Sequence, residues 1–390
     1  MEVPMFFRCP ISMELMQDPV TISTGVSYEK KNIERWFFHY KKKTCPATMQ
    51  LLESFDLTPN HTLKRLILSW QDREAPSLPF TALKHGELTA LLRTVESTPF
   101  KVRSLKKIGS MFDMGDEIKA EFIKLGGIDV LGRIIFQILL ENYDFATFRA
   151  CEEALSVLHR LPLFNESSVR LLSKPECVKS MAVMLQRGSA ETRLHTVMIL
   201  REMVKIECDW GQITSDLDMD IFKSLLELLS DEIYNKASSC ALDVLIEIVG
   251  PSRKNRVKSV EAGAVCILIE LLPDSNRPKC EKMLFLLKML CECAEGRLAL
   301  SDHRLAVAVI SKKIQNVSEL ATKLGVKILW LVCSFHQTKQ ILEEMLVFGA
   351  VKKLVGLLHI NGESSTKEKA MKIVKLHEKS WRQYPCFPWK

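Results

Sequence analysis

The feature that most restricts how this chain can fold is a helical phrase that recurs between residues 128 and 358. The copies have apolar residues at positions x, x+3, x+6 and x+7, which is the spacing of one buried face of a helix; a weak copy keeps only Val307, Ile310 and Ile314. The copies begin at residues 128, 178, 222, 265, 307 and 351, and these starting points differ by 50, 44, 43, 42 and 44. Because a single unit of this kind cannot bury its own apolar face, neighbouring units must stack into an α-solenoid.

The cleanest copy runs through residues 263–272 and opens with Gly263, as the copies at Gly127 and Gly349 also open with glycine. Further helical segments, such as residues 236–248, lie between the copies. A period of about 40 to 47 residues made only of helices is typical of armadillo and HEAT repeats. The phrase resembles the third armadillo helix, where glycine gives the sharp bend out of the second helix.

The first 75 residues carry a different pattern, that of a small α+β domain. Short runs at residues 20–23 and 26–28 flank Thr24-Gly25 and predict a compact hairpin. Residues 30–40 predict a helix, and Asn60 is expected to cap another. The apolar faces of these two helices hold Ile33, Trp36, Phe37 and Tyr40 in the first and Leu63, Leu66, Ile67 and Trp70 in the second.

A domain this small usually needs a staple such as zinc. Its Cys and His residues are only Cys9, Cys45, His39 and His61, without a Cys-x2-Cys pair, so we expect no metal site here. The two cysteines are then small buried apolar residues. Hydrogen bonds and ion pairs must hold the loops instead, and the side chains expected to make them are Asp18, Ser23, Glu29, Glu34, Thr48 and Asn60.

The N-terminal segment closely resembles the U-box of plant U-box ubiquitin ligases with armadillo repeats. The residues that carry the resemblance are Cys9-Pro10-Ile11-Ser12-Met13-Glu14, Asp18-Pro19-Val20-Thr21, Tyr28, Ile33-Glu34-Arg35-Trp36, Cys45-Pro46 and Leu57-Thr58-Pro59-Asn60. The resemblance implies a mainly α protein in which a zinc-free, RING-shaped U-box precedes the armadillo α-solenoid. We predict a U-box at residues 1–75, a linker at 76–80 and armadillo repeats at 81–390.

The resemblance also implies where a ubiquitin-conjugating enzyme binds. Its groove contacts are Ile11 and Pro46, with Trp36 on the helix between the loops, and Met13 enlarges the exposed apolar patch. The residues expected to have a structural role in the U-box are Cys9, Asp18, Pro19, Val20, Tyr28, Glu34 and Asn60. No catalytic residue is expected, because this family transfers ubiquitin directly from the conjugating enzyme without a covalent ligase intermediate.

One position departs from the family pattern. Many members have a basic residue three positions after the proline of the second loop, where it donates hydrogen bonds to the conjugating enzyme and to ubiquitin. Here that position is Met49, whose thioether cannot donate a hydrogen bond. Either Gln50 substitutes for the donor or activation of the ubiquitin thioester is weakened.

The repeats show no chemistry of their own. We expect a protein substrate on the solenoid groove, and outward lysines would favour an acidic or phosphorylated segment, unless they are ordinary solvated side chains. These lysines are Lys179, Lys223, Lys312, Lys352 and Lys353. Repeat cysteines at 208, 240, 266, 291, 293 and 333 are expected to fill the core, and the histidines are dispersed along the chain without ligand spacing.

The sequence therefore predicts an E3 ubiquitin-protein ligase without a cofactor, with a role in plant immune or stress signalling implied by the resemblance. The net charge of +7 is spread too thinly for a nucleic-acid partner. No secretory signal or membrane span is found, so a cytoplasmic location is expected. The alternative is a non-catalytic armadillo scaffold with an inactive or weakened U-box. Self-association, the substrate and the preferred conjugating enzyme are left open.

Overall fold

The structure is a computed structural model that describes residues 4–74, 80–97, 101–139, 144–162, 170–205, 210, 219–231, 235–335, 338–359, 364–384 and 387. The chain forms two compact units, Met1–Leu83 and Lys84–Lys390. The linker predicted at 76–80 lies outside the described residues except for Phe80, which begins a helix. The predicted domain boundaries remain a prediction.

The N-terminal unit is built around a three-stranded antiparallel sheet of order β2-β1-β3. Its strands are β1 (Pro19–Thr21), β2 (Ser27–Glu29) and β3 (Thr58–Pro59). β1 and β2 form the predicted hairpin with Val20 opposite Tyr28, and Gly25 takes a φ of +79° in the turn. The third strand was not predicted, because two residues are too short a run to give a period in the sequence.

The helices of this unit are η1 (Met5–Phe7), α1 (Lys30–Glu34), the π-helical turn η2 (Arg35–His39) and α2 (His61–Glu74). Ile33 and Phe37 are buried, but Tyr40 is 54% exposed, because the wider π turn rotates it away from the predicted face. The Asn60 cap is confirmed, since its Oδ1 accepts the Leu63 N–H at 2.9 Å. The predicted apolar face of α2 is wrong at Leu66, which is 54% exposed.

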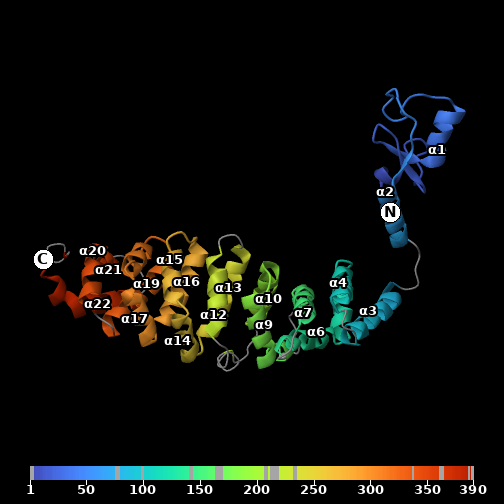
Figure 1. Ribbon diagram of the computed structural model, residues 1–390. Coiled ribbons are helices and arrows are strands. Elements are labelled where there is room, and N and C mark those ends of the chain that lie inside the picture. The colour runs from blue at the N-terminus through green and yellow to red at the C-terminus, as the bar shows by residue number, and fades with distance from the viewer. Residues whose placement is uncertain are drawn as a thin grey trace. The chain divides into compact units, whose positions relative to one another are not determined.

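The second unit is an array of helices that runs from α3 to α22 (Figure 1). The long helices are α4 (Lys101–Phe112), α7 (Phe145–Leu158), α10 (Ala190–Met203), α13 (Asn235–Val249), α16 (Arg277–Leu290), α19 (Glu319–Phe335) and α22 (Ser364–Trp381). The helices of the recurring phrase are α6 (Gly127–Phe136), α9 (Pro175–Arg187), α12 (Met219–Ser230), α15 (Ala264–Leu271), α18 (Ala306–Lys313) and α21 (Ala350–His359). The remaining helices are α3 (Phe80–Ser97), α5 (Asp116–Lys124), η3 (Gln137–Leu139), α14 (Arg253–Glu261), α17 (Ala294–Asp302) and α20 (Lys339–Val347).

The long helices pack one after the next from α4 to α22 and form one continuous row. Most of the phrase helices also contact the phrase helix of the next repeat and form a second row. Apolar phrase positions are buried or half-buried in every copy, as predicted from their spacing. The core is therefore a continuous layer between stacked repeats rather than a separate core in each one.

The glycine that opens a phrase helix has a specific conformational role. Gly263 and Gly349 take φ values of +92° and +73°, in the left-handed region that glycine enters without steric cost. In the first copy the bend lies at Gly126, one residue before the predicted Gly127. Gly127 is needed for another reason, because a Cβ there would lie 2.3 Å from the Phe122 ring.

Two predictions about repeat side chains need correction. Cys266 is exposed and does not fill the core, whereas Cys240, Cys291, Cys293 and Cys333 are buried as expected. Residue 208 lies outside the described part of the chain.

The predicted set of outward lysines also changes, and one of them, Lys223, pairs with Asp220 at 3.6 Å. Lys179, Lys223, Lys312 and Lys352 are exposed on the phrase helices, but Lys353 is half-buried. Its Nζ donates hydrogen bonds to main-chain oxygens at the end of the preceding phrase helix.

None of the helices in the described ranges has an apolar stretch long enough to cross a bilayer.

The Lys353 ammonium should hold two repeats together. It donates to the carbonyl oxygens of Ser311 at 2.7 Å and Ile314 at 2.8 Å, which the C-terminal end of α18 leaves without helical partners. Lys353→Met should lower the free energy of unfolding by about 1.5 to 3 kcal/mol, the usual value of hydrogen bonds from a charged donor. Urea unfolding measures this. Lys352→Met, at the exposed neighbour, is the matched control, and equal losses in both variants would contradict the assignment.

Candidate functional site

Two loops of the N-terminal unit share one backbone geometry. In the first, the Cys9 N–H donates to the Glu14 carbonyl at 2.7 Å, and the Met13 N–H donates to the Cys9 carbonyl at 2.8 Å. In the second, the Cys45 N–H donates to the Gln50 carbonyl at 2.9 Å, and the Met49 N–H donates to the Cys45 carbonyl at 2.8 Å. Each loop is closed by a β-bridge between the residues that flank it, at Arg8↔Leu15 and Thr44↔Leu51.

The two methionines occupy the same unusual position in their loops. Met13 has a φ of +59° and Met49 a φ of +58°, a left-handed conformation that non-glycine residues seldom adopt. The signal for this duplication was in the sequence, because Cys-Pro-x-Ser/Thr-Met occurs at Cys9 and again at Cys45. Both Cys-Pro pairs were noted from the sequence, but the repeated loop was not predicted.

The sulfur of Cys9 organises the first loop from inside. It is fully buried and accepts hydrogen bonds from the Glu29 N–H at 3.3 Å and from Asn32 Nδ2 at 3.5 Å. Burial alone would raise the pKa of Cys9, but the hydrogen bonds from Asn32 and from the backbone of Ser12, Glu29 and Ile11 outweigh it and lower that pKa. Asn32 Nδ2 also donates to Ser12 Oγ at 3.0 Å, which makes Asn32 a loop-holding residue that the sequence analysis missed.

The sulfur of Cys45 organises the second loop in the same way. Tyr28 Oη lies 3.0 Å from Cys45 Sγ and accepts the Ala47 N–H at 3.1 Å, while Thr24 Oγ1 donates to the sulfur at 3.4 Å. Burial would raise the pKa of Cys45, but hydrogen bonds from Thr24, Thr48 and Tyr28 outweigh it and lower the pKa to about 6. Burial and the bond to Cys45 raise the pKa of Tyr28 in turn.

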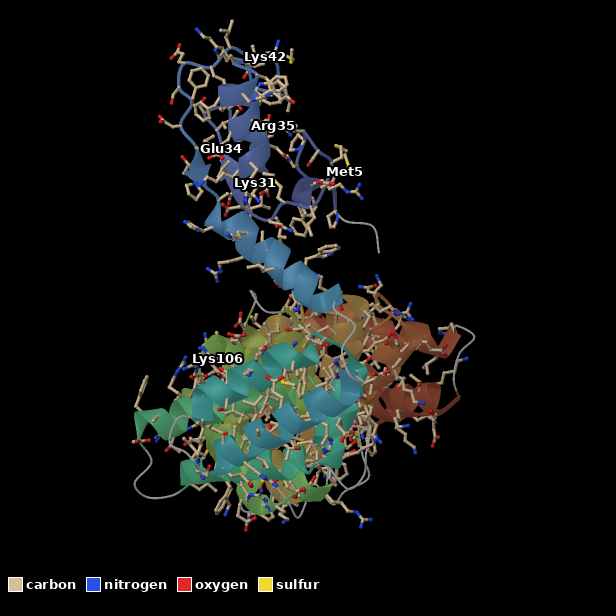
Figure 2. The ribbon with its side chains drawn as sticks, turned by 90° about the vertical axis from the view of Figure 1, so that its right-hand side faces the viewer. Met5, Lys31, Glu34, Arg35, Lys42 and Lys106 are labelled. Carbon is tan, nitrogen blue, oxygen red and sulfur yellow. The ribbon has the colours of Figure 1, made fainter. Side chains whose placement is uncertain are left out.

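The helix between the loops holds them on one face. Asn32 and Trp36 are one helical turn apart, and Figure 2 shows Lys31, Glu34 and Arg35 along the same segment. Asn32 binds the first loop, and Trp36 Nε1 donates to the Thr44 carbonyl of the second loop at 2.8 Å. The helix therefore fixes both loops at once.

We call the apolar side chains at this face the two-loop surface, and they are Ile11, Met13, Trp36 and Pro46. Ile11 is 37% exposed and Met13 is 51% exposed, while Trp36 and Pro46 are half-buried. Exposed apolar groups on rigid loops lose little entropy when a partner covers them. The arrangement can bind a protein, and the described residues of this unit offer no exposed thiol, because Cys9 and Cys45 are both fully buried.

Three of the predicted supporting residues lie at the start of β1. Pro19 and Val20 are buried. Asp18 is exposed, and its carboxylate pairs with Lys64 Nζ at 2.8 Å, which lowers the pKa of Asp18. The Asp18 N–H donates to the Glu29 carboxylate at 2.9 Å. These contacts of Asp18 join the start of β1 to β2 through Glu29 and to α2 through Lys64.

Asn60 is a second junction, because its Nδ2 donates to Thr21 Oγ1 and Ser27 Oγ, both at 3.2 Å. One side chain thus connects β1, β2 and the start of α2. Among the described residues, neither Glu34 nor Ser23 makes a side-chain hydrogen bond or ion pair. These two side chains do not take part in the network that was expected to hold the loops.

The second loop ends in two exposed residues, Met49 and Gln50. Met49 is 68% exposed, and its thioether offers no hydrogen-bond donor. Gln50 uses its main-chain carbonyl to accept the Cys45 N–H, and its amide side chain is exposed beside Met49. The one side-chain donor of this pair is therefore the Gln50 amide.

The comparisons with known proteins agree with this geometry. A U-box domain model matches residues 3–75, and the model of the plant U-box protein ARM repeat region matches residues 87–389. The chain is 35% identical to E3 ubiquitin-protein ligase PUB22 of Arabidopsis thaliana, with 99% of this chain and 97% of that protein covered. E3 ubiquitin-protein ligase PUB23 of the same plant is also 35% identical, with 99% and 95% covered.

A solved engineered protein from the Northeast Structural Genomics Consortium has a TM-score of 0.50 at 18% identity, covering 81% of this chain and 74% of that protein. At this identity the likeness concerns the fold alone.

The Tyr28 hydroxyl should be required for the second loop to keep its shape. Tyr28→Phe removes the group between Cys45 Sγ and the Ala47 N–H, and leaving buried partners unsatisfied costs about 1 to 3 kcal/mol. We expect a lower melting temperature of this unit and faster hydrogen–deuterium exchange in residues 44–52. The control is Tyr40→Phe, at a tyrosine that is 54% exposed. If the two variants exchange equally in this loop, the hydroxyl is not what holds it.

Proposed function

The chain belongs to the plant U-box E3 ubiquitin-protein ligases with an armadillo-repeat region, and we propose that its two-loop surface recruits the ubiquitin-charged conjugating enzyme. The observation that supports this most directly is the exposure of Ile11 and Met13 on a loop that is closed by its own main-chain hydrogen bonds and held by Asn32. Exposed apolar anchors on a rigid frame are the usual centre of a modest protein interface. An inactive scaffold would gain nothing from keeping such anchors exposed.

In this proposal the ligase acts by positioning. The substrate lysine amine attacks the thioester carbonyl carbon, the carbon–sulfur bond to the conjugating enzyme breaks, and an isopeptide bond forms while the amine proton passes to solvent. The described part of the U-box offers no thiol to the reaction, since Cys9 and Cys45 are fully buried. The contribution of the ligase is the high effective concentration of the lysine beside the thioester when both partners are held by one chain.

We assign the substrate to the armadillo array. Four exposed lysines occur on successive or nearby phrase helices, which favours an acidic or phosphorylated segment as the bound element. They are Lys179, Lys223, Lys312 and Lys352. Tyr384 donates a hydrogen bond to Glu343 and is not part of this lysine surface. A role in plant immune or stress signalling completes the proposal on the strength of the family resemblance, and a cytoplasmic location follows from the expected lack of a secretory signal.

Ile11→Ala should separate docking from folding. The Ile11 side chain is partly exposed, whereas Trp36 also holds the second loop through Thr44, so a Trp36 variant would confuse the two effects. Loss of one interface anchor costs about 2 kcal/mol, or roughly thirtyfold in affinity. We expect that loss in the binding of a charged conjugating enzyme and in single-turnover ubiquitin discharge, with an unchanged melting temperature.

The control for Ile11→Ala is Leu68→Ala, at an apolar residue of α2 that is 50% exposed. Equal activity in the two variants would reject the assigned surface.

The ligase function itself is tested by the wild-type protein with activating enzyme, ATP, ubiquitin and a broad panel of conjugating enzymes. Failure to form ubiquitin chains with any of them would leave the armadillo scaffold as the better description.

Met49→Arg should restore the missing donor. Met49 already carries a side chain at positive φ, so arginine adds no new backbone cost. A charge-assisted hydrogen bond to the thioester complex is worth about 1.5 kcal/mol or more, which corresponds to a rate increase of about tenfold. The measurement is ubiquitin discharge to free lysine at saturating charged conjugating enzyme. Met13→Arg, at the matching position of the first loop, should give no increase. An unchanged rate in Met49→Arg would mean that Gln50 or another group already serves.

A further inference from the structure

A cysteine, a glutamate and a histidine from two neighbouring repeats meet at the surface of the armadillo array. Cys266 and Glu270 lie one turn apart on α15 and are exposed. His303 follows α17 and precedes α18, and α15 contacts α17. One potential ligand atom from each of the three side chains lies within 4.8 Å of the other two.

The two side chains on α15 would repel each other if the thiol were ionised in the absence of a cation. Cys266 Sγ donates a weak hydrogen bond to Glu270 Oε1 at 3.5 Å. Burial raises the pKa of the Cys266 thiol, and so do the hydrogen bond and the negative charge of Glu270. Within the described residues, no lysine or arginine pairs with the Glu270 carboxylate. A divalent cation placed between the sulfur and the carboxylate would stabilise both anions together.

The ring of His303 is held by a weak hydrogen bond. Its Nδ1 accepts this bond from the Leu305 N–H at 3.3 Å. The bond is long, so little is lost if the ring turns to offer one of its two nitrogens to a metal. The short turn between α17 and α18 fixes where the ring can lie relative to α15.

We propose that Cys266, Glu270 and His303 form a zinc site that joins consecutive repeats. A thiolate sulfur, an imidazole nitrogen and a carboxylate oxygen are the three ligand types that zinc takes in proteins, and a water molecule would complete four-coordination. Binding converts the thiol to a zinc-bound thiolate, and its proton is released to solvent. The ion would then connect the phrase helix α15 to the turn before the next phrase helix, α18.

Cys266 differs from the other cysteines in its accessibility. It is the exposed one among the free cysteines of the described residues, and the other nine lie buried. A soluble metal ion or an alkylating reagent can therefore reach Cys266 without local unfolding. This exposure gives the site a readout that does not depend on ligase activity.

The full-length protein should bind one equivalent of zinc at this site, measured after dialysis by elemental analysis and by competition with a chromophoric chelator. Cobalt in place of zinc should give the thiolate-to-metal charge-transfer absorption of a sulfur ligand. Zinc should slow alkylation of Cys266 by iodoacetamide at least tenfold, as followed on its peptide by mass spectrometry. Acidification should release the metal, because the thiolate and the imidazole compete for protons.

Cys266→Ser and His303→Asn should each weaken zinc binding by at least about tenfold, a loss that altering even an outer partner of a metal site can cause. His303→Asn keeps Cys266, so loss of zinc protection in this variant tests the joint site and not the thiol alone. The matched control is His85→Asn, at an exposed histidine that pairs with Glu121 and should leave zinc binding unchanged. The proposal is overturned if the wild-type protein binds no zinc in the micromolar range, or if both ligand variants bind it as the wild type does.

Discussion

The two-loop surface depends on hydrogen bonds that converge on two buried sulfur atoms. Cys9 and Cys45 sit inside loops of the same backbone form, and donors from β2 and its neighbours reach both of them. Asn32 and Trp36 then tie one loop each to a single helix. A domain this small needs such a network, because its core alone stabilises it only weakly. The rigidity that keeps the loops folded also keeps Ile11 and Met13 exposed.

The armadillo array obeys a different constraint, because no repeat is complete without the next. Its apolar phrase positions are buried against adjacent helices. Polar side chains also bind groups of the neighbouring repeat. Lys353 binds carbonyls of the preceding phrase helix, and Arg201 binds Asp243 of the following long helix at 2.9 Å. Zinc held by Cys266, Glu270 and His303 would be a further link between repeats. Zinc binding would therefore change how these two repeats stack on each other.

Local sequence patterns succeeded where contacts between near neighbours decide the structure. The hairpin, the Asn60 cap and the buried phrase helices were predicted because turn residues, capping side chains and helical spacing act within a few residues. The same reasoning failed at Tyr40 and Leu66, where a π turn and the limited size of the core decide which side chains are buried. It also missed Asn32, whose partners Cys9 and Ser12 lie about 20 residues earlier.

By itself, the sequence determined the solenoid, the U-box and the family, because the repeat period and the ordered motifs are properties of the chain as written. Only the tertiary structure decided that Met49 lies at positive φ beside an exposed Gln50, and that Lys353 is a half-buried capping group. It also decided that Cys266 is exposed beside a histidine 37 positions further along the sequence. The physical reason is common to these cases. Each depends on contacts between atoms from different turns or repeats, and the local periodicity of a sequence does not contain that information.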